Sequence, residues 1–182
     1  VHRDEALDMR RDPTSSRPTA REILATIDEV DLRRLIWAYG EERWAPRIAS
    51  WIIRERASRP IETSGQLARL IENAIPRAAW PPKSHPATRT FQALRILVND
   101  ELAGLEGAIQ SAVGFLAPRG RLAVITFHSL EDRIVKDFFK KRADEGLGTI
   151  LTKKPIAPSE AELTINPKAR SSKLRIIEKI NY

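Results

Sequence analysis

The sequence predicts an α/β protein in which a helical subdomain accompanies part of a larger sheet. Residues 19–76 carry apolar residues at helical spacing and no strand pattern. Residues 121–128 form a continuous apolar run of strand length, and residues 172–180 form a second strand-like segment. A continuous apolar run is typical of a strand covered on both faces, which needs neighbouring strands at its sides. Because this chain supplies few such neighbours, we expect the first half of the sheet to be absent from it.

The composition is that of a folded protein with a basic surface. Hydrophobic residues make up 42% and charged residues 30% of the 182 residues, and there is no cysteine. A disulfide framework and a thiolate metal site are therefore excluded. The three histidines lie far apart in the sequence, so we expect no metal cofactor. The net charge of +7 favours a nucleic-acid partner, although a solvated basic surface serving solubility accounts for it equally well.

Targeting signals are not found in the sequence. No apolar run approaches the roughly 20 residues of a membrane span, and no signal peptide opens the chain. We therefore expect a cytoplasmic location and no membrane partner. An exposed half-sheet would favour association, so a homodimer is a possible state.

Four helices are predicted after an irregular segment of 18 residues. Thr19 and Thr63 each precede an acid or amide by three residues, which is the spacing of a capping box. Gly40 is expected to end the second helix in a left-handed conformation, and Pro46 falls in the first turn of the third, where proline is tolerated. The helices are expected to begin near residues 19, 28, 41 and 63, with Pro76 ending the fourth.

After a proline-rich linker, in which we expect Trp80 to be docked on a surface, the apolar residues recur at helical spacing from 91 to 116. They predict one long helix or two helices that meet near Asn99 and Asp100. The strand of residues 121–128 follows, and then a helix that Ser129 is expected to cap. Residues 143–172 are expected to be irregular, with a short strand near residues 149–154.

The segment "HPATRTFQALRILVN" (residues 85–99) carries polar residues at the edge of its apolar side. Thr88, Gln92, Arg95 and Asn99 lie about a quarter turn from the core direction, since each helical residue adds about 100°. A polar stripe beside the core lines a cleft between packed elements. The alternative is a set of interhelical hydrogen bonds with a partly exposed arginine.

A second candidate is "TFHSLEDR" (residues 126–133), where the predicted strand passes into a helix. Ligands of open α/β sheets bind beyond the carboxyl ends of strands. Phe127 is able to stack on a base, and His128 is able to exchange hydrogen bonds at neutral pH. The alternative makes His128 a satisfied turn residue, Ser129 a helix cap and Phe127 part of the core.

A third candidate is the basic segment "NPKARSSKLR" (residues 166–175). Its cations suit RNA phosphates or a solvated face equally well. They are Lys168, Arg170, Lys173 and Arg175. The chain has no glycine-rich nucleotide loop and no spacing typical of a hydrolytic triad. "LDMRRD" (residues 7–12) is a weak signal by itself.

Five stretches resemble one family, the bacterial S-adenosylmethionine-dependent methyltransferases that modify cytosine N4 in 16S ribosomal RNA (the RsmH or MraW family). They run in order from Leu7 to about Ile176 and are "LDMRRDP", "YGEERWAPRIASWI", "HPATRTFQALRILVNDEL", "RGRLAVITFHSLEDRIVKDFF" and "NPKARSSKLRI". The resemblance implies part of a Rossmann-type methyltransferase domain with a helical insertion. It implies a connecting segment at residues 1–18, the insertion on the RNA side at 19–83, and the carboxyl-terminal part of the α/β domain at 84–182.

The family's glycine-rich loop and cofactor-binding residues precede the "LDMRRD" stretch, so none is carried over. S-adenosylmethionine is therefore expected for the intact enzyme and not for this chain alone, with 16S ribosomal RNA in the small subunit as substrate. Arg119 stands where the family usually has a second glycine, a difference that we expect to be neutral.

The resemblance also suggests roles for individual residues. Asn99 and His128 are the candidate catalytic residues, and they line the substrate cleft with Gln92 and Arg95. Phe127 is expected to stack on the extruded target base or shape its pocket, and Arg89 to steer phosphate. His85 is expected to fix a hinge. The full predicted substrate-binding set is His85, Arg89, Thr90, Gln92, Arg95, Asn99, Phe127, His128 and Ser129.

Three functional hypotheses remain. The chain is a fragment of the methyltransferase that is inactive alone, a standalone RNA-binding or ribosome-assembly module without catalysis, or one half of a split enzyme.

Overall fold

The computed structural model describes residues 4–180, so His2 lies outside the described residues. The chain divides into two compact units, with the boundary between Glu101 and Leu102. In the part that the structure describes, no helix combines the length and apolar character required to cross a membrane. The domain boundaries expected at 18/19 and 83/84 concern the intact protein and stay a prediction.

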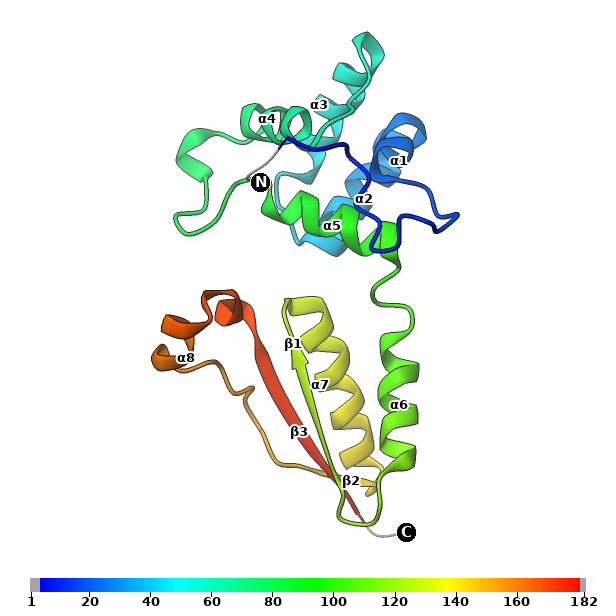
Figure 1. Ribbon diagram of the computed structural model, residues 1–182, viewed down its shortest axis with the longest axis vertical. Coiled ribbons are helices and arrows are strands. Elements are labelled where there is room, and N and C mark those ends of the chain that lie inside the picture. The colour runs from blue at the N-terminus through cyan, green and yellow to red at the C-terminus, as the bar shows by residue number, and fades with distance from the viewer. Residues whose placement is uncertain (1–3, 181–182) are drawn as a thin grey trace. The chain divides into compact units, whose positions relative to one another are not determined.

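The first unit is helical (Figure 1). Its core is formed by the inner faces of α1 to α5, and Leu7 from the preceding loop is buried in it. The four helices expected from the sequence are confirmed, and the helix of residues 88–99 packs in the same core. The elements are α1 (Ala20–Thr26), α2 (Glu29–Gly40), α3 (Ala45–Ser58), α4 (Ser64–Ala74), the short 3₁₀ helix η1 (Arg77–Ala79) and α5 (Thr88–Asn99).

Local hydrogen bonds define where these helices begin. Thr19 and Thr63 both complete the predicted capping boxes, and Pro46 lies in the first turn of α3 as expected. At the end of α2 the prediction was wrong by one residue, because Glu41 adopts the left-handed conformation at φ 49°. Gly40 has a different role: a Cβ atom there would lie 2.6 Å from the carbonyl oxygen of Arg89. Glycine is therefore required where α2 and α5 approach each other.

The second unit contains a three-stranded antiparallel sheet with strand order β1-β3-β2. The register pairs Arg121 with Glu178 and Thr126 with Lys173. The short strand near residues 149–154 and the final strand were predicted, whereas the short helices between them were not. The elements are α6 (Leu105–Phe115), β1 (Arg121–Thr126), α7 (Ser129–Asp144), β2 (Gly148–Ile150), α8 (Glu160–Ile165), η2 (Pro167–Ser171) and β3 (Lys173–Lys179).

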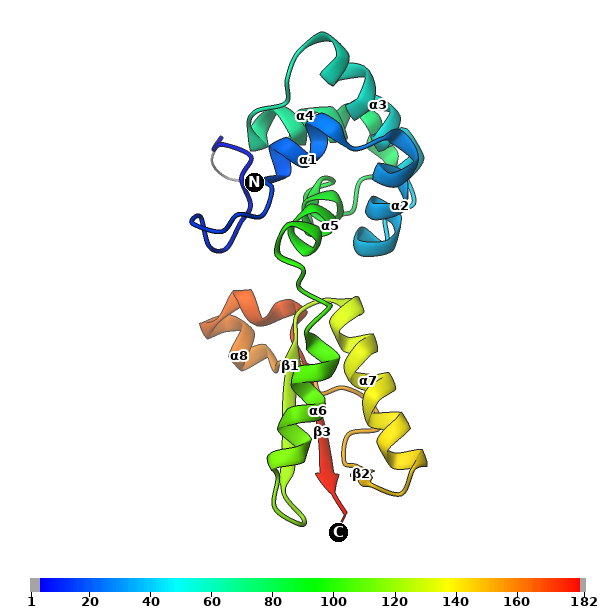
Figure 2. The ribbon, with the colours of Figure 1, turned by 90° about the vertical axis from the view of Figure 1, so that its right-hand side faces the viewer.

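Helices α6 and α7 cover one face of this sheet (Figure 2). Val135 and Phe139 of α7 and Ile109 of α6 pack there against Ile177 of β3. The opposite face is open in the described chain. Ile125, whose side chain lies on that face of β1, is 60% exposed. The expectation that β1 is covered on both faces is therefore wrong for this chain. Its pairing is antiparallel, and β3 is its single neighbour among the described strands.

Two turns of the chain, one after α5 and one before β1, contain a residue in the left-handed conformation. The apolar repeat from 91 to 116 is two helices, which confirms the second alternative, and α5 ends at Asp100 with φ 51°. The turn before β1 contains Arg119 with φ 61°. A side chain in this region carries a conformational cost that glycine avoids, and whether the arginine is neutral overall stays a prediction.

Candidate functional site

The polar residues of α5 hold neighbouring backbone. Gln92 donates from Nε2 to the carbonyl oxygen of Tyr39 in α2, at 3.0 Å. Asn99 bonds to the loop before α1, and the Arg95 side chain is 45% exposed. Thr88 is exposed at the first residue of the helix. The alternative of interhelical hydrogen bonds with a partly exposed arginine therefore describes these contacts, and substrate binding by the stripe stays a prediction.

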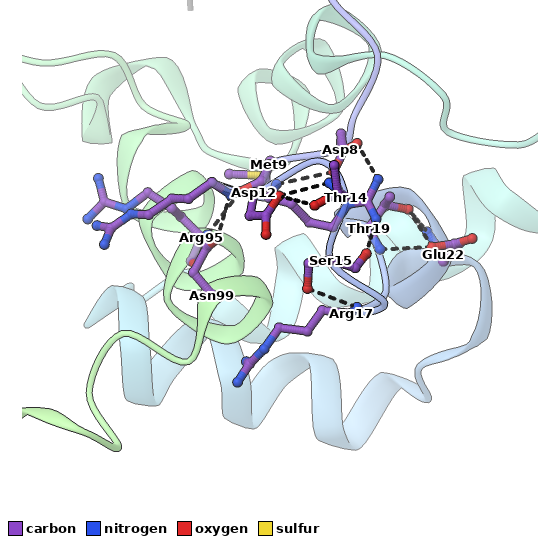
Figure 3. A network of polar contacts seen from close by, with 12 residues as sticks. Asp8, Met9, Asp12, Thr14, Ser15, Arg17, Thr19, Glu22, Arg95 and Asn99 are labelled. Carbon is purple, nitrogen blue, oxygen red and sulfur yellow. Dashed lines mark hydrogen bonds and ion pairs between the residues drawn. The ribbon is translucent and has the colours of Figure 1, made fainter.

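Asn99 uses all the polar atoms of its side chain (Figure 3). Its Nδ2 donates to the carbonyl oxygens of Met9 and Arg95, both at 2.9 Å, and its Oδ1 accepts from the backbone N–H of Arg11 at 2.8 Å. Met9 has φ 66°, so the loop turns sharply at this point. Asn99 is thereby fixed against residues 9–11.

The same loop is held from within by an ion pair. Arg10 donates from Nε and Nη2 to the two carboxylate oxygens of Asp8, at 2.7 and 2.9 Å. Its Nη1 donates to the carbonyl oxygen of Ser15 at 2.6 Å. The hydrogen bonds from Arg10 lower the pKa of Asp8 to about 2. The carboxylate therefore stays ionised at neutral pH, and the arginine that it holds fixes the start and end of the turn.

A cluster of charges follows at the end of α5. Glu101 accepts from Nε and Nη2 of Arg95, at 3.0 and 3.2 Å. The Nη2 of Arg11 lies 3.0 Å from Oε1 of the same carboxylate. Two arginines thus share one acid, which leaves a net positive charge, and both side chains remain partly exposed.

The three remaining predicted residues of the first unit differ in accessibility. His85 lies 2.9 Å from Glu72 through Nε2, and its Nδ1 accepts from the N–H of Ala87. It therefore ties the linker to α4, and its role as a hinge in the intact protein stays a prediction. Arg89 is exposed and donates to the carbonyl oxygen of Glu41. Thr90, by contrast, is fully buried because it lies one turn before Leu94 on the core side, so it presents no surface to a substrate here.

In the second unit, β1 passes into α7 through Phe127 and His128. His128 is the N-cap: its Nδ1 accepts from the N–H of Glu131, whose carboxylate accepts in return from the N–H groups of Phe127 and His128. The expectation that Ser129 caps α7 is wrong, because His128 has the extended conformation of a cap and Ser129 is already helical. An Nδ1 that accepts requires the neutral imidazole with its proton on Nε2, which lies 3.3 Å from Oε1 of Glu131.

Phe127 is accessible in the described chain, and its role as a stacking residue stays a prediction. It is 56% exposed although it is a large apolar side chain. The alternative that places Phe127 in the core is therefore wrong. Ser129 follows it at the first position of α7.

Two of the four cations of the basic segment have an internal partner. Arg175 is buried and donates from Nε and Nη2 to Asp132, at 2.6 and 3.1 Å. Lys173 lies 3.4 Å from the same carboxylate. These two residues join β3 to α7, whereas Lys168 and Arg170 are exposed.

The sequence signals did not identify the residues that hold the 8–15 loop. Asp8, Arg10 and Arg11 belong to "LDMRRD", which was weak by itself because a local charge pattern does not reveal a partner such as Asn99, 88 residues away from Arg11. The repeated acid–arginine alternation was the available signal.

A helical unit and a small α/β unit, whose first strand ends at a capped helix, define a protein of the α/β class. The model of the MraW methylase family matches residues 1–180, and the chain therefore belongs to this family. It is 50% identical over 97% of its length to the ribosomal RNA small subunit methyltransferase H of Geotalea uraniireducens. It is likewise 50% identical to the protein of that name from Heliobacterium modesticaldum, over 97% of its length, and 49% identical to that of Heliobacterium mobile, over 99%.

The chain spans 61 to 62% of the length of these relatives. Methyltransferases of this family imply S-adenosylmethionine, whose ribose hydroxyls suit a free carboxylate beyond a strand end. Near the end of β1 the carboxylate of Glu131 accepts from two backbone N–H groups, and that of Asp132 is paired with Arg175. These residues do not fit the cofactor.

Proposed function

We propose that this chain is the RNA-binding part of an enzyme that transfers a methyl group from S-adenosylmethionine to N4 of a cytosine in 16S ribosomal RNA. The observation that carries the proposal is the 50% identity, over 97% of the chain, to a protein named ribosomal RNA small subunit methyltransferase H. The net charge of +7 and the paired arginines at Glu101 support an RNA substrate. A ribosomal RNA substrate also supports a cytoplasmic location.

The cofactor pocket is proposed to lie on polypeptide outside this chain. The engaged carboxylates of Glu131 and Asp132 support this part of the proposal, as does the open face of β1 at Ile125. The chain alone is then expected to be inactive and not to bind S-adenosylmethionine. A homodimer stays a prediction that sedimentation velocity will test.

The test is a fusion of this chain behind the part of the Geotalea uraniireducens relative that it does not cover. The fusion is expected to transfer a radiolabelled methyl group to N4 of cytosine in small-subunit RNA, whereas the isolated chain is not. A fusion that folds and binds S-adenosylmethionine but leaves the RNA unmodified would contradict the proposal. Reconstitution by two separate chains would identify a split enzyme.

A catalytic role of His128 can be tested separately from its role as the cap of α7. His128→Asn retains a cap acceptor, while His128→Ala removes it. If the imidazole contributes to the reaction, both variants of the fusion lose methylation, but only the alanine variant loses thermal stability. If His128 is a cap alone, the asparagine variant keeps its activity.

Arg95→Ala is expected to weaken RNA binding in the same fusion, because the exposed guanidinium at Glu101 is removed.

A second candidate is an RNA-binding or assembly module without catalysis. The engaged carboxylates near β1 favour it, since neither Glu131 nor Asp132 is free to accept from a cofactor. Salt-sensitive RNA binding by the isolated chain, together with an inactive but cofactor-binding fusion, would support this candidate.

A further inference from the structure

A cavity of about 410 Å³ opens within the first unit, between the start of α3, the loop after α4 and the start of α5. This volume lies in the range of small-ligand sites, ~300–1,000 Å³. Two indole rings, Trp44 and Trp80, form part of its wall, and the guanidinium-bearing residues Arg43 and Arg89 form another part.

Both indoles contact an arginine before any ligand arrives. Trp80 donates from Nε1 to the carbonyl oxygen of Ile75 at 3.1 Å, and the guanidinium of Arg77 lies 4.0 Å from its ring centre. The guanidinium of Arg43 lies 5.7 Å from the ring centre of Trp44. Fixed aromatic rings lose little conformational freedom on binding, so they are suited to stack on a flat ligand.

The polar groups of the wall match the parts of a nucleotide. Arg43 and Arg89 are exposed cations that suit a phosphate. Glu42 is 5% exposed and offers a carboxylate that accepts hydrogen bonds from an exocyclic amine of a base. Nε1 of Trp44 is a buried donor with no acceptor among the described residues.

We propose that this pocket, which we call the Trp44–Trp80 pocket, binds one unpaired nucleotide of single-stranded RNA. The proposal rests on the proposed function in that the ligand belongs to the RNA substrate. The nucleotide is unpaired because a base in a duplex has both faces covered by its neighbours and offers none to an indole. An acidic peptide would satisfy the arginines but would leave two indole faces without a planar partner.

The test is a titration of the complete chain with a labelled single-stranded oligoribonucleotide and with the same strand annealed to its complement, followed by anisotropy. Tighter binding of the single strand is expected. Trp80→Leu is expected to weaken that binding about tenfold, and Arg43→Ala to weaken it and reduce its salt dependence. The matched controls are Trp37→Leu, since Trp37 is 61% exposed on α2, and Arg54→Ala on the exposed side of α3. Both controls are expected to stay within twofold of the parent chain.

Three results would overturn the proposal: equal losses in Trp80→Leu and Trp37→Leu, equal affinity for single strand and duplex, or displacement of the RNA by polyglutamate at the same charge concentration. Circular dichroism and melting temperature verify that each variant is folded, and Trp80→Phe, which retains an aromatic face, is expected to lose less binding than Trp80→Leu. The anisotropy titration of the pocket variants is independent of the methylation assay of the fusion protein. If the fusion methylates RNA but the pocket variants bind RNA like the parent chain, the pocket proposal is contradicted and the proposed function is not.

Discussion

The side-chain amide of Asn99, at the end of α5, donates to the carbonyl oxygen of Met9 across 2.9 Å, although 90 positions separate the two residues. This bond and its companion from Arg11 N–H attach the loop before α1 to the helix that ends the first unit. The loop carries Arg10 and Arg11, so its geometry determines where two cations lie. Asn99 therefore positions a basic surface, whether or not it also contacts a substrate.

Substitution of Asn99 is expected to destabilise the first unit. Asn99→Ala removes three hydrogen bonds, and Asn99→Asp replaces the two donations by a carboxylate that faces carbonyl oxygens. We expect each to lower the free energy of unfolding by about 2 kcal/mol, measured by urea denaturation, and to speed proteolysis near residues 9–11. Asn73→Ala, at an exposed position of α4, is the control. Equal stability of the Asn73 and Asn99 variants would contradict this role.

Gly40 is expected to tolerate no side chain. A Cβ atom would lie 2.6 Å from the carbonyl oxygen of Arg89, so Gly40→Ala must push α2 away from α5. We expect a loss of about 1–3 kcal/mol, measured by calorimetry. Gly107→Ala in α6 is the matched control, because nothing lies within 4 Å of its Cβ position and alanine favours the helix. The two substitutions should change stability in opposite directions, and a stabilising Gly40→Ala would refute the argument.

Features governed by neighbours in the sequence could be predicted, and features governed by distant partners could not. The capping boxes at Thr19 and Thr63 depend on residues three positions apart, so their spacing was sufficient. Gly40 was predicted as a left-handed helix stop, which is wrong, and glycine is needed there because of the backbone of Arg89, 49 positions further on. The helical periodicity of α5 identified Gln92 and Asn99 as polar residues at the core edge, yet their acceptors, Tyr39 and Met9, belong to other segments.

In the second unit, too, features set by neighbouring residues could be predicted and features set by distant residues could not. The apolar run of β1 predicted a strand, but burial of its second face depends on polypeptide packed against Ile125, which a run of apolar letters does not specify. The sequence predicted Ser129 as the cap of α7, but the cap is His128. Backbone conformation decided between them, since His128 is extended and Ser129 is helical.

Substitution of Arg119 by glycine is expected to stabilise the protein. Its φ of 61° carries a cost for any residue with a side chain, while Gly120 beside it has no room, because a Cβ atom there would lie 2.7 Å from the carbonyl oxygen of Ala117. Arg119→Gly is therefore expected to raise the free energy of unfolding by roughly 1 kcal/mol, which is measured as a higher melting temperature. Gly120→Ala is expected to lower it. A destabilising Arg119→Gly would show that the arginine side chain makes a contribution larger than its backbone cost.

The pair of Asp132 and Arg175 is expected to make the second unit acid-sensitive. The hydrogen bonds from Arg175 lower the pKa of Asp132 below its ordinary 3.8, with further support from Lys173 against the opposing effect of burial. A carboxyl whose pKa is lower in the folded state binds its proton more readily when unfolded. Its contribution to stability is therefore fully present above pH 3.8 and is lost as the pH falls through the folded pKa.

Asp132→Asn is expected to cost about 3–5 kcal/mol at neutral pH, because it leaves Arg175 buried without a counter-charge. The difference from the parent chain should begin to shrink below pH 3.8, where the carboxyl of the unfolded chain is protonated, and should vanish below the lower pKa of the folded state. Melting temperatures of the two proteins between pH 2 and 7 measure both effects. Asp137→Asn, on the same helix with a 60% exposed side chain, is the control and should follow the parent curve. A constant gap between the Asp132→Asn and parent curves across this range would show that the substitution acts through packing and not through the ion pair.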